Sequence, residues 1–168
     1  MRTVLGFTAI LAGVLLASTA ARADDGAPWR VTSPRVRLTD ADGRLELVIP
    51  AGRARGATSR AIPIEPGQTY LAMARLDLDD LIAKGAFLRV ALYARTDGRG
   101  RQRLRLDSTA LRAGADGVSV GFLTPAWARA AKLRVLARPS ADGTALDASD
   151  VLLLPLESAP DVILRPDE

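Results

Sequence analysis

The side chains that carry most enzyme chemistry are scarce in this sequence. Its 168 residues include no histidine and no cysteine, which excludes the commonest general base, a cysteine nucleophile and a zinc–thiolate site. Carboxylates gather at Asp77, Asp79 and Asp80, but the last two are typical helix-capping residues. Glycoside hydrolysis needs two carboxyl groups placed across a sugar, and no such pair can be assigned. The sequence therefore predicts a protein that is not an enzyme.

Arginine and tyrosine share one face of a predicted strand, Phe87–Arg95. Alternation makes the opposite face apolar throughout. A guanidinium binds a carboxylate or phosphate through two parallel hydrogen bonds, and a tyrosine ring can stack on a sugar. The pattern predicts a polysaccharide-binding face that prefers acidic ligands, and the alternative is a solvated sheet face that the tyrosine only shields. With arginines from strands of similar polarity, the candidate contacts are Arg75, Arg89, Tyr93, Arg95 and Arg134.

The N-terminal segment has the layout of a targeting signal. Arg2 precedes the uncharged run Thr3–Ala20, and Ala21–Ala23 places alanines two apart before two acids. A basic start, an apolar core and an A-x-A site are typical of a secretory signal peptide. We therefore expect residues 1–23 to be cleaved and the remainder to be periplasmic or secreted, with no stable membrane anchor. The alternative is an uncleaved anchor, for which the run is near the lower length limit.

Short alternating segments separated by turn residues fill residues 24–156. One predicted hairpin surrounds the turn Asp40–Gly43, and a short helical turn is expected at Asp79–Lys84, before Gly85. About nine such strands, at the spacing seen in β-sandwiches, predict an all-β domain of two packed antiparallel sheets. Residues 157–168 are expected to form a short C-terminal tail.

Several of these segments resemble a known family. Ile62–Tyr70, which reads IPIEPGQTY, is similar to the hairpin of galactose-binding-like jelly-roll domains, notably the CenC-type carbohydrate-binding modules. A strand like Leu88–Tyr93, an F-x-x-P segment at Phe122–Pro125 and a closing strand at Asp150–Leu153 follow in the family's order. The likeness spans Trp29–Leu156. It implies a jelly-roll β-sandwich and suggests carbohydrate binding by analogy.

The resemblance also bears on individual residues. Tyr70 is expected inside the sandwich, as strand aromatics usually are, and Trp29 is expected to close one of its ends. Trp127 lies between alanines in a loop, where a large ring is either a loop anchor or the wall of a binding site. Related domains often hold a structural calcium with an acid on the last strand, and Asp150 is the matching position. Calcium needs about six or more oxygen ligands, of which only this one can be assigned.

Together these observations predict an exported, non-catalytic protein similar to a carbohydrate-binding module. Its expected ligand is a cell-envelope or extracellular polysaccharide, preferably an acidic one. The alternative is a structural or assembly β-sandwich that contacts another envelope protein. Export, and the nearly balanced charge left after Arg2 and Arg22 are removed, disfavour a nucleic-acid partner.

Overall fold

The computed structural model describes residues 21–22, 29–41, 43–78, 85–111, 117–139 and 141–156. Within these ranges every regular element is a strand, and no helix is long and apolar enough to cross a membrane. The predicted helical turn at Asp79–Lys84 lies outside the described residues. The strands are β1 (Ala21–Arg22), β2 (Arg30–Val31), β3 (Arg37–Ala41), β4 (Arg44–Ile49), β5 (Arg55–Thr58), β6 (Ile62–Pro63), β7 (Thr69–Leu78), β8 (Ala86–Tyr93), β9 (Leu104–Asp107), β10 (Gly117–Leu123), β11 (Ala130–Ala137) and β12 (Thr144–Leu156).

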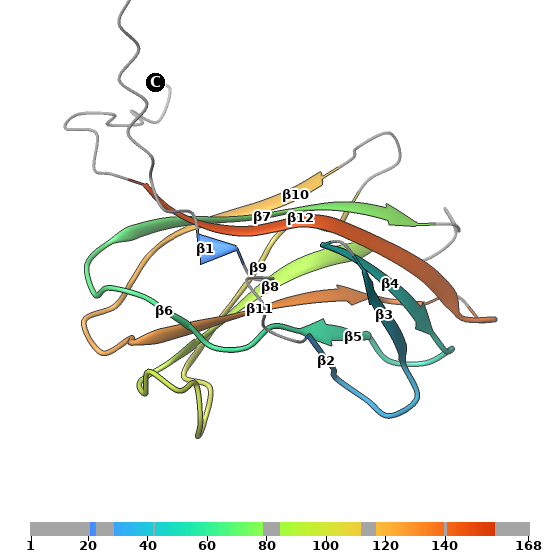
Figure 1. Cartoon of the computed structure of the whole chain (residues 1–168), viewed down its shortest axis with the longest axis horizontal. Coiled ribbons are helices and arrows are strands. Elements are labelled where there is room, and N and C mark those ends of the chain that lie inside the picture. The colour runs from blue at the N-terminus through green and yellow to red at the C-terminus, as the bar shows by residue number, and fades with distance from the viewer. Residues whose placement is uncertain are drawn as a thin grey trace, which may run out of the picture.

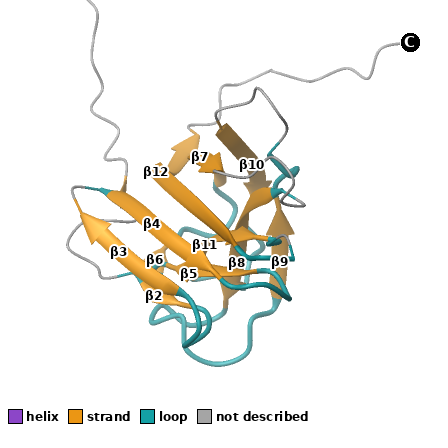
Figure 2. Ribbon diagram, turned by 90° about the vertical axis from the view of Figure 1, so that its right-hand side faces the viewer, coloured by secondary structure: helices purple, strands orange, loops and turns teal. Residues whose placement is uncertain are grey.

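Two antiparallel sheets form the two layers of a sandwich (Figure 1). Sheet A has the order β10-β7-β12-β4-β3, with β1 paired to β12. Sheet B has the order β2-β5-β11-β8-β9, with β6 paired to β11. Figure 2 shows β12, β4 and β3 side by side in one layer and the strands of sheet B in the other. The predicted all-β sandwich is therefore confirmed.

Alternating residues of both sheets supply the core between the layers. On β4, Leu45, Leu47 and Ile49 are buried, whereas the residues between them are exposed. Tyr70 stacks on Phe122 with ring centroids 5.9 Å apart. Burial of apolar surface is the main favourable term in folding, and the period of two lets one face of each strand contribute to it.

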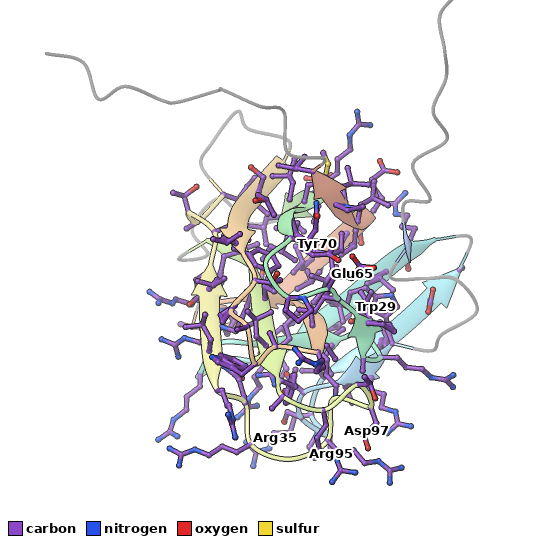
Figure 3. The ribbon with its side chains drawn as sticks, turned by 90° about the vertical axis from the view of Figure 1, so that its left-hand side faces the viewer. Trp29, Arg35, Glu65, Tyr70, Arg95 and Asp97 are labelled. Atoms are coloured by element: carbon purple, nitrogen blue, oxygen red, sulfur yellow. The ribbon has the colours of Figure 1, made fainter. Side chains whose placement is uncertain are left out.

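Tyr70, which was predicted to lie inside the sandwich, does so, and Trp29 is buried as well. Tyr70 is 7% exposed, and the backbone N–H of Glu65 donates a hydrogen bond to its hydroxyl oxygen at 3.1 Å. Trp29 is 5% exposed and belongs to the same core. Figure 3 shows these residues within the body of the sandwich, far from Arg95 and Asp97 at one end of the molecule.

The last strand differs from the sequence-based expectation. It begins at Thr144, six residues before the closing strand Asp150–Leu153 of the family resemblance, and its pairing with β7 shifts register between Ser149 and Leu152. Asp150 lies in this β-bulge with φ of 49°, in the left-handed region. An extra residue in one strand reverses which side chains face the core. Even-numbered residues face inward before the bulge, and odd-numbered residues do so after it.

Candidate ligand-binding face

Strand register brings basic side chains together on the outer face of sheet B. Directly opposed residues in an antiparallel pair share one side of the sheet. One row across five strands is Asp107, Arg89, Arg134, Thr58 and Arg30, and the neighbouring row holds Arg105, Ala91 and Lys132. We name the five cations of these rows the basic face: Arg30, Arg89, Arg105, Lys132 and Arg134.

A bidentate ion pair lies within the basic face. Arg89 donates two hydrogen bonds to Asp107, from Nε at 2.6 Å and from an Nη at 2.8 Å. These hydrogen bonds, together with the charges of Arg89 and Arg105, hold the pKa of the Asp107 carboxyl below its usual value. Arg89 also lies over the ring of Phe87, 5.3 Å from its centroid. Both the cation and the ring beneath it are therefore already engaged within the protein.

Tyr93 lies on the predicted side of its strand but is not an exposed platform. Tyr93 is only 5% exposed, and it packs in a small buried cluster with Ala91 and Ala130. The Nζ of Lys132 is 4.9 Å from the ring centroid, and Arg134 donates a hydrogen bond to the hydroxyl at 3.0 Å. The expectation of a free stacking ring is therefore wrong for this structure. The tyrosine instead positions two cations of the basic face.

The β8–β9 loop explains why this outward-facing cluster is buried. Gly98 in that loop has φ of 62°, and a Cβ there would lie 2.7 Å from the Cβ of Ala61 and from the Cε of Lys132. The loop therefore packs against the outer face of sheet B at Gly98. A larger side chain at this position would collide with Ala61 and Lys132. Alternation along β8 predicts the side on which a residue lies, but it carries no information about this cover.

Arg95 and Trp127 are not part of the rows that form the basic face. Arg95 follows the end of β8, and its Nη2 lies 3.3 Å from Asp97 in the β8–β9 loop (Figure 3). Trp127 is partly buried against the main core, and the guanidinium of Arg103 lies 5.7 Å from its ring centroid. This arrangement fits a loop anchor whose outer surface is covered by an arginine.

Arg75 is on the opposite side of the molecule. It lies on β7 in sheet A, where its Nε is 3.7 Å from a carboxylate oxygen of Asp150. The sequence-based grouping of Arg75 with Arg89 and Arg134 is therefore wrong, because the strands that carry them belong to different sheets. Similar polarity along a strand shows which side faces outward, but not which sheet the strand joins.

The surroundings of Asp150 do not fit a calcium site. Calcium requires a cluster of oxygen ligands, and the structure describes no group of three His, Cys, Asp or Glu residues that would hold a metal. Asp150 pairs with the guanidinium of Arg75, and a positive charge at this position disfavours a bound cation. The carboxylate instead lies at the bulge and faces Arg75.

Besides Arg30 on β2, four residues of this face were absent from the predicted contacts: Phe87, Arg105, Asp107 and Lys132. Alternation was sufficient to find two of them, because Phe87 lies two residues before Arg89 and Lys132 two residues before Arg134. The pairing of β9 with β8 was needed to place the other two beside Arg89. They belong to a short strand whose neighbour is not evident from the sequence.

Comparison with known proteins identifies the fold. No family model matches the chain, and no curated protein matches it. A solved structure of the CBM22-1–GH10 modules of xylanase 10B from Clostridium thermocellum, in complex with xylohexaose, superimposes with a TM-score of 0.60 at 13% identity, covering 77% of this chain and 26% of that one. This chain thus spans about a quarter of that polypeptide.

Two further structures match over nearly their full length. A CBM4 structure matches with a TM-score of 0.53 at 22% identity, covering 76% of this chain and 94% of that one. A structure of accessory secretory proteins 1, 2 and 3 from Streptococcus pneumoniae matches with a TM-score of 0.51 at 10% identity, covering 76% and 90%. The chain therefore has the jelly-roll β-sandwich fold of carbohydrate-binding modules, as the sequence resemblance implied.

Proposed function

We propose that this protein is an exported, non-catalytic polysaccharide-binding module that holds an acidic polysaccharide of the cell envelope or extracellular matrix on its basic face. The observation that carries the proposal is the convergence of five cations on one sheet of a fold shared with carbohydrate-binding modules. Fold alone does not specify a ligand, so the preference for acidic ligands is argued from the charges on this face.

Charge dominates the proposed recognition because the aromatic surface is covered. The rings of Phe87 and Tyr93 both lie beneath cationic side chains, so neither offers a bare face to a sugar. Asp107 is the one acid in the two described rows, and it engages Arg89. The two rows therefore hold five cations and one carboxylate, which leaves the basic face with a net positive charge. A chain of uronate or phosphate groups gains charge-assisted hydrogen bonds from guanidinium donors, whereas a neutral glycan does not.

The proposal includes export, with cleavage after Ala23. The support is the charged start, apolar run and alanine spacing of the N-terminal segment. Mass spectrometry of the protein recovered from the periplasm or the medium would measure its N-terminus. A mature chain that begins at Asp24 is expected, and retention of the whole segment in membranes would contradict this part of the proposal.

Binding to an acidic and a neutral polysaccharide tests the ligand class. We expect the mature protein to bind alginate, a polyuronate, more tightly than xylan, with affinity falling as salt is raised, because exposed charges are screened over about 8 Å at physiological ionic strength. Replacing Lys132 and Arg134 together by glutamine should weaken alginate binding about tenfold, equivalent to about 1.4 kcal/mol. Arg75→Gln, on the opposite sheet, is the matched control and should leave binding unchanged.

Two results would overturn the preference for acidic ligands. Salt-insensitive binding of xylan would show that the basic face is only a solvated surface. An equal loss of alginate binding in the Arg75→Gln control would show that the ligand senses net charge rather than this face.

A second function, assembly with another envelope protein, is supported by a different surface. The outer face of sheet A carries exposed apolar side chains, including Leu123 at 65% exposure and Leu156 at 40%. Large exposed apolar patches commonly mark protein contacts. If no polysaccharide on a glycan array binds and one partner protein co-purifies with the exported chain, the assembly function replaces the glycan-binding one.

A further inference from the structure

A contiguous apolar patch occupies half of the outer face of sheet A. Register places the outward side chains of β7, β10 and β12 beside one another: Leu152 lies opposite Met73, Leu154 opposite Leu71, and Leu156 and Leu123 flank Thr69. We name this group the sheet A patch, formed by Leu71, Met73, Leu123, Leu152, Leu154 and Leu156. Outside the patch, the same face carries the charged residues Arg75, Asp77 and Asp147 and the exposed Val48.

The β-bulge at Asp150 creates this patch. Before the bulge, the outward residues of β12 are Ala145, Asp147 and Ser149, which suit a solvated face. After it, the outward positions fall on leucines, while Val151 and Leu153 enter the core. Without the bulge, Leu152, Leu154 and Leu156 would face inward and Leu153 would face outward. The fold therefore turns leucines outward at a specific place, beside one edge of β12.

That edge of β12 has room for an added strand. On the side opposite β7, β4 pairs with β12 from Thr144 to Ala148 and ends there. Beyond the bulge, the pairing described on this side comes from β1, in which Ala21 and Arg22 lie opposite Leu153 and Leu152 (Figure 1). A short, extended segment thus occupies the edge. It belongs to the 1–23 segment that the proposed cleavage removes.

We infer that the β12 edge from Val151 to Leu156, together with the adjoining sheet A patch, is a docking site for an extended strand of a partner polypeptide, and that β1 occupies this site until residues 1–23 are removed. The inference uses the proposed cleavage but not the proposed glycan binding, which involves the opposite sheet.

The edge and the patch define the chemistry of the partner strand. Unpaired N–H and C=O groups on a sheet edge bind any extended backbone, and side chains at alternate positions provide specificity. Here one side of the added strand adjoins Leu152 and Leu154, so a partner with apolar side chains at every second residue should bind this edge more tightly than β1, which places Arg22 opposite Leu152. β1 covers two register positions of this edge, which leaves space for a longer strand.

Two lengths of the chain allow a direct test. A chain from Ser18 retains β1, whereas a chain from Asp24 lacks it, and both retain the core residues, which run from Trp29 to Leu153. Amide hydrogen exchange at Leu152–Leu154 should be at least tenfold faster in the chain from Asp24. A peptide with the sequence of residues 17–23, ASTAARA, should restore protection at saturating concentration. The same peptide with prolines in place of Ala21 and Arg22 should not, because proline cannot donate to the ladder.

Matched substitutions locate the site. Leu154→Lys in the sheet A patch should weaken peptide binding at least fivefold, because it places a charge beside the added strand. Val48→Lys alters an exposed apolar residue of the same sheet outside the patch, and it should leave peptide binding unchanged. Circular dichroism of each variant verifies folding, and alginate binding by both should match that of the unsubstituted chain.

Other occupants would overturn the inference in recognisable ways. Equal exchange in the two chains would show that β1 does not cover the edge. A dimer of the chain from Asp24 that protects Leu152–Leu154 would assign the edge to a second copy. Protection that is lost only when residues 157–168 are removed would assign it to the chain's own tail. Peptide binding that Val48→Lys and Leu154→Lys weaken equally would show that the contact is nonspecific.

Discussion

The outer faces of the two sheets have opposite chemistry although the same architecture supports both. On sheet B, apolar side chains that point outward, such as Phe87 and Tyr93, lie beneath cations or the β8–β9 loop. On sheet A, outward leucines such as Leu123 and Leu156 remain exposed. The comparison shows that an outward position in a strand is not the same as a solvent-exposed one. What covers the position decides its function.

The same difference separates the two functions proposed for the molecule. A face of fixed cations suits an anionic ligand, whereas an apolar surface beside a strand edge suits another polypeptide. The two faces lie on opposite sides of the core, so substitutions on one are not expected to change binding at the other. Substitutions on each face therefore test this difference most directly.

The largest effect is expected at Tyr93, where the comparison predicts a structural role. Tyr93→Ala removes a ring that is only 5% exposed and should lower the free energy of unfolding by about 3 kcal/mol, measured by urea denaturation. Tyr93→Phe retains the ring and loses the hydrogen bond from Arg134, so it should cost about 1 kcal/mol. An unchanged stability for Tyr93→Ala would show that the ring is a free stacking surface after all.

An intermediate effect is expected at the bulge that distinguishes sheet A. Asp150 has φ of 49°, a conformation that aspartate tolerates and β-branched residues resist. Asp150→Val should lower the free energy of unfolding by about 1–2 kcal/mol, whereas Asp150→Gly should be neutral or stabilising because glycine adopts this conformation freely. Thermal unfolding of both variants measures the difference. Equal melting temperatures for the two would argue against a strained backbone at this position.

A smaller effect is expected from acid on sheet B. The folded-state pKa of Asp107 is lowered, first by its hydrogen bonds from Arg89, so the ionised carboxylate stabilises the fold. That stability is fully present above the ordinary pKa of 3.8 and is lost as pH falls through the lowered value. The pair is partly solvated, so its contribution should be under about 1 kcal/mol.

Asp107→Asn is the variant that measures this contribution. It should flatten the decrease in stability below pH 4 relative to the unsubstituted chain, in urea titrations at a series of pH values. A stability difference between the two chains that stays constant from neutral pH down to pH 2 would contradict the assignment.

The smallest effect on stability is expected at the exposed end of the sheet A patch. Leu123 is 65% exposed, and Leu123→Lys should change the free energy of unfolding by no more than about 0.5 kcal/mol. The same substitution should reduce binding of a hydrophobic dye such as anilinonaphthalene sulfonate, because it interrupts the patch. Val48→Lys provides the comparison outside the patch. Equal dye binding by both variants would show that the leucines do not form one continuous surface.

Much of the fold was accessible from the sequence because it depends on local patterns. Alternation along the chain placed Leu45, Leu47 and Ile49 on one face of a strand, and the turn Asp40–Gly43 joined that strand to its partner. The same alternation put Arg89 and Tyr93 on the polar side of β8. These inferences hold because side chains of a strand alternate with a period of two wherever the strand lies.

The tertiary structure decided the features that depend on contacts between distant segments. Arg75 joined sheet A and not the face of Arg134, because strand pairing is set by the whole sandwich and not by the polarity of one strand. The bulge at Asp150 decided which residues of β12 face outward. The loop at Gly98 packed against Ala61 and Lys132, which lie beside Tyr93. Periodicity determines the side of the strand on which a residue lies. Only the packing of distant segments determines which sheet the strand joins, its register there and which segments cover the residue.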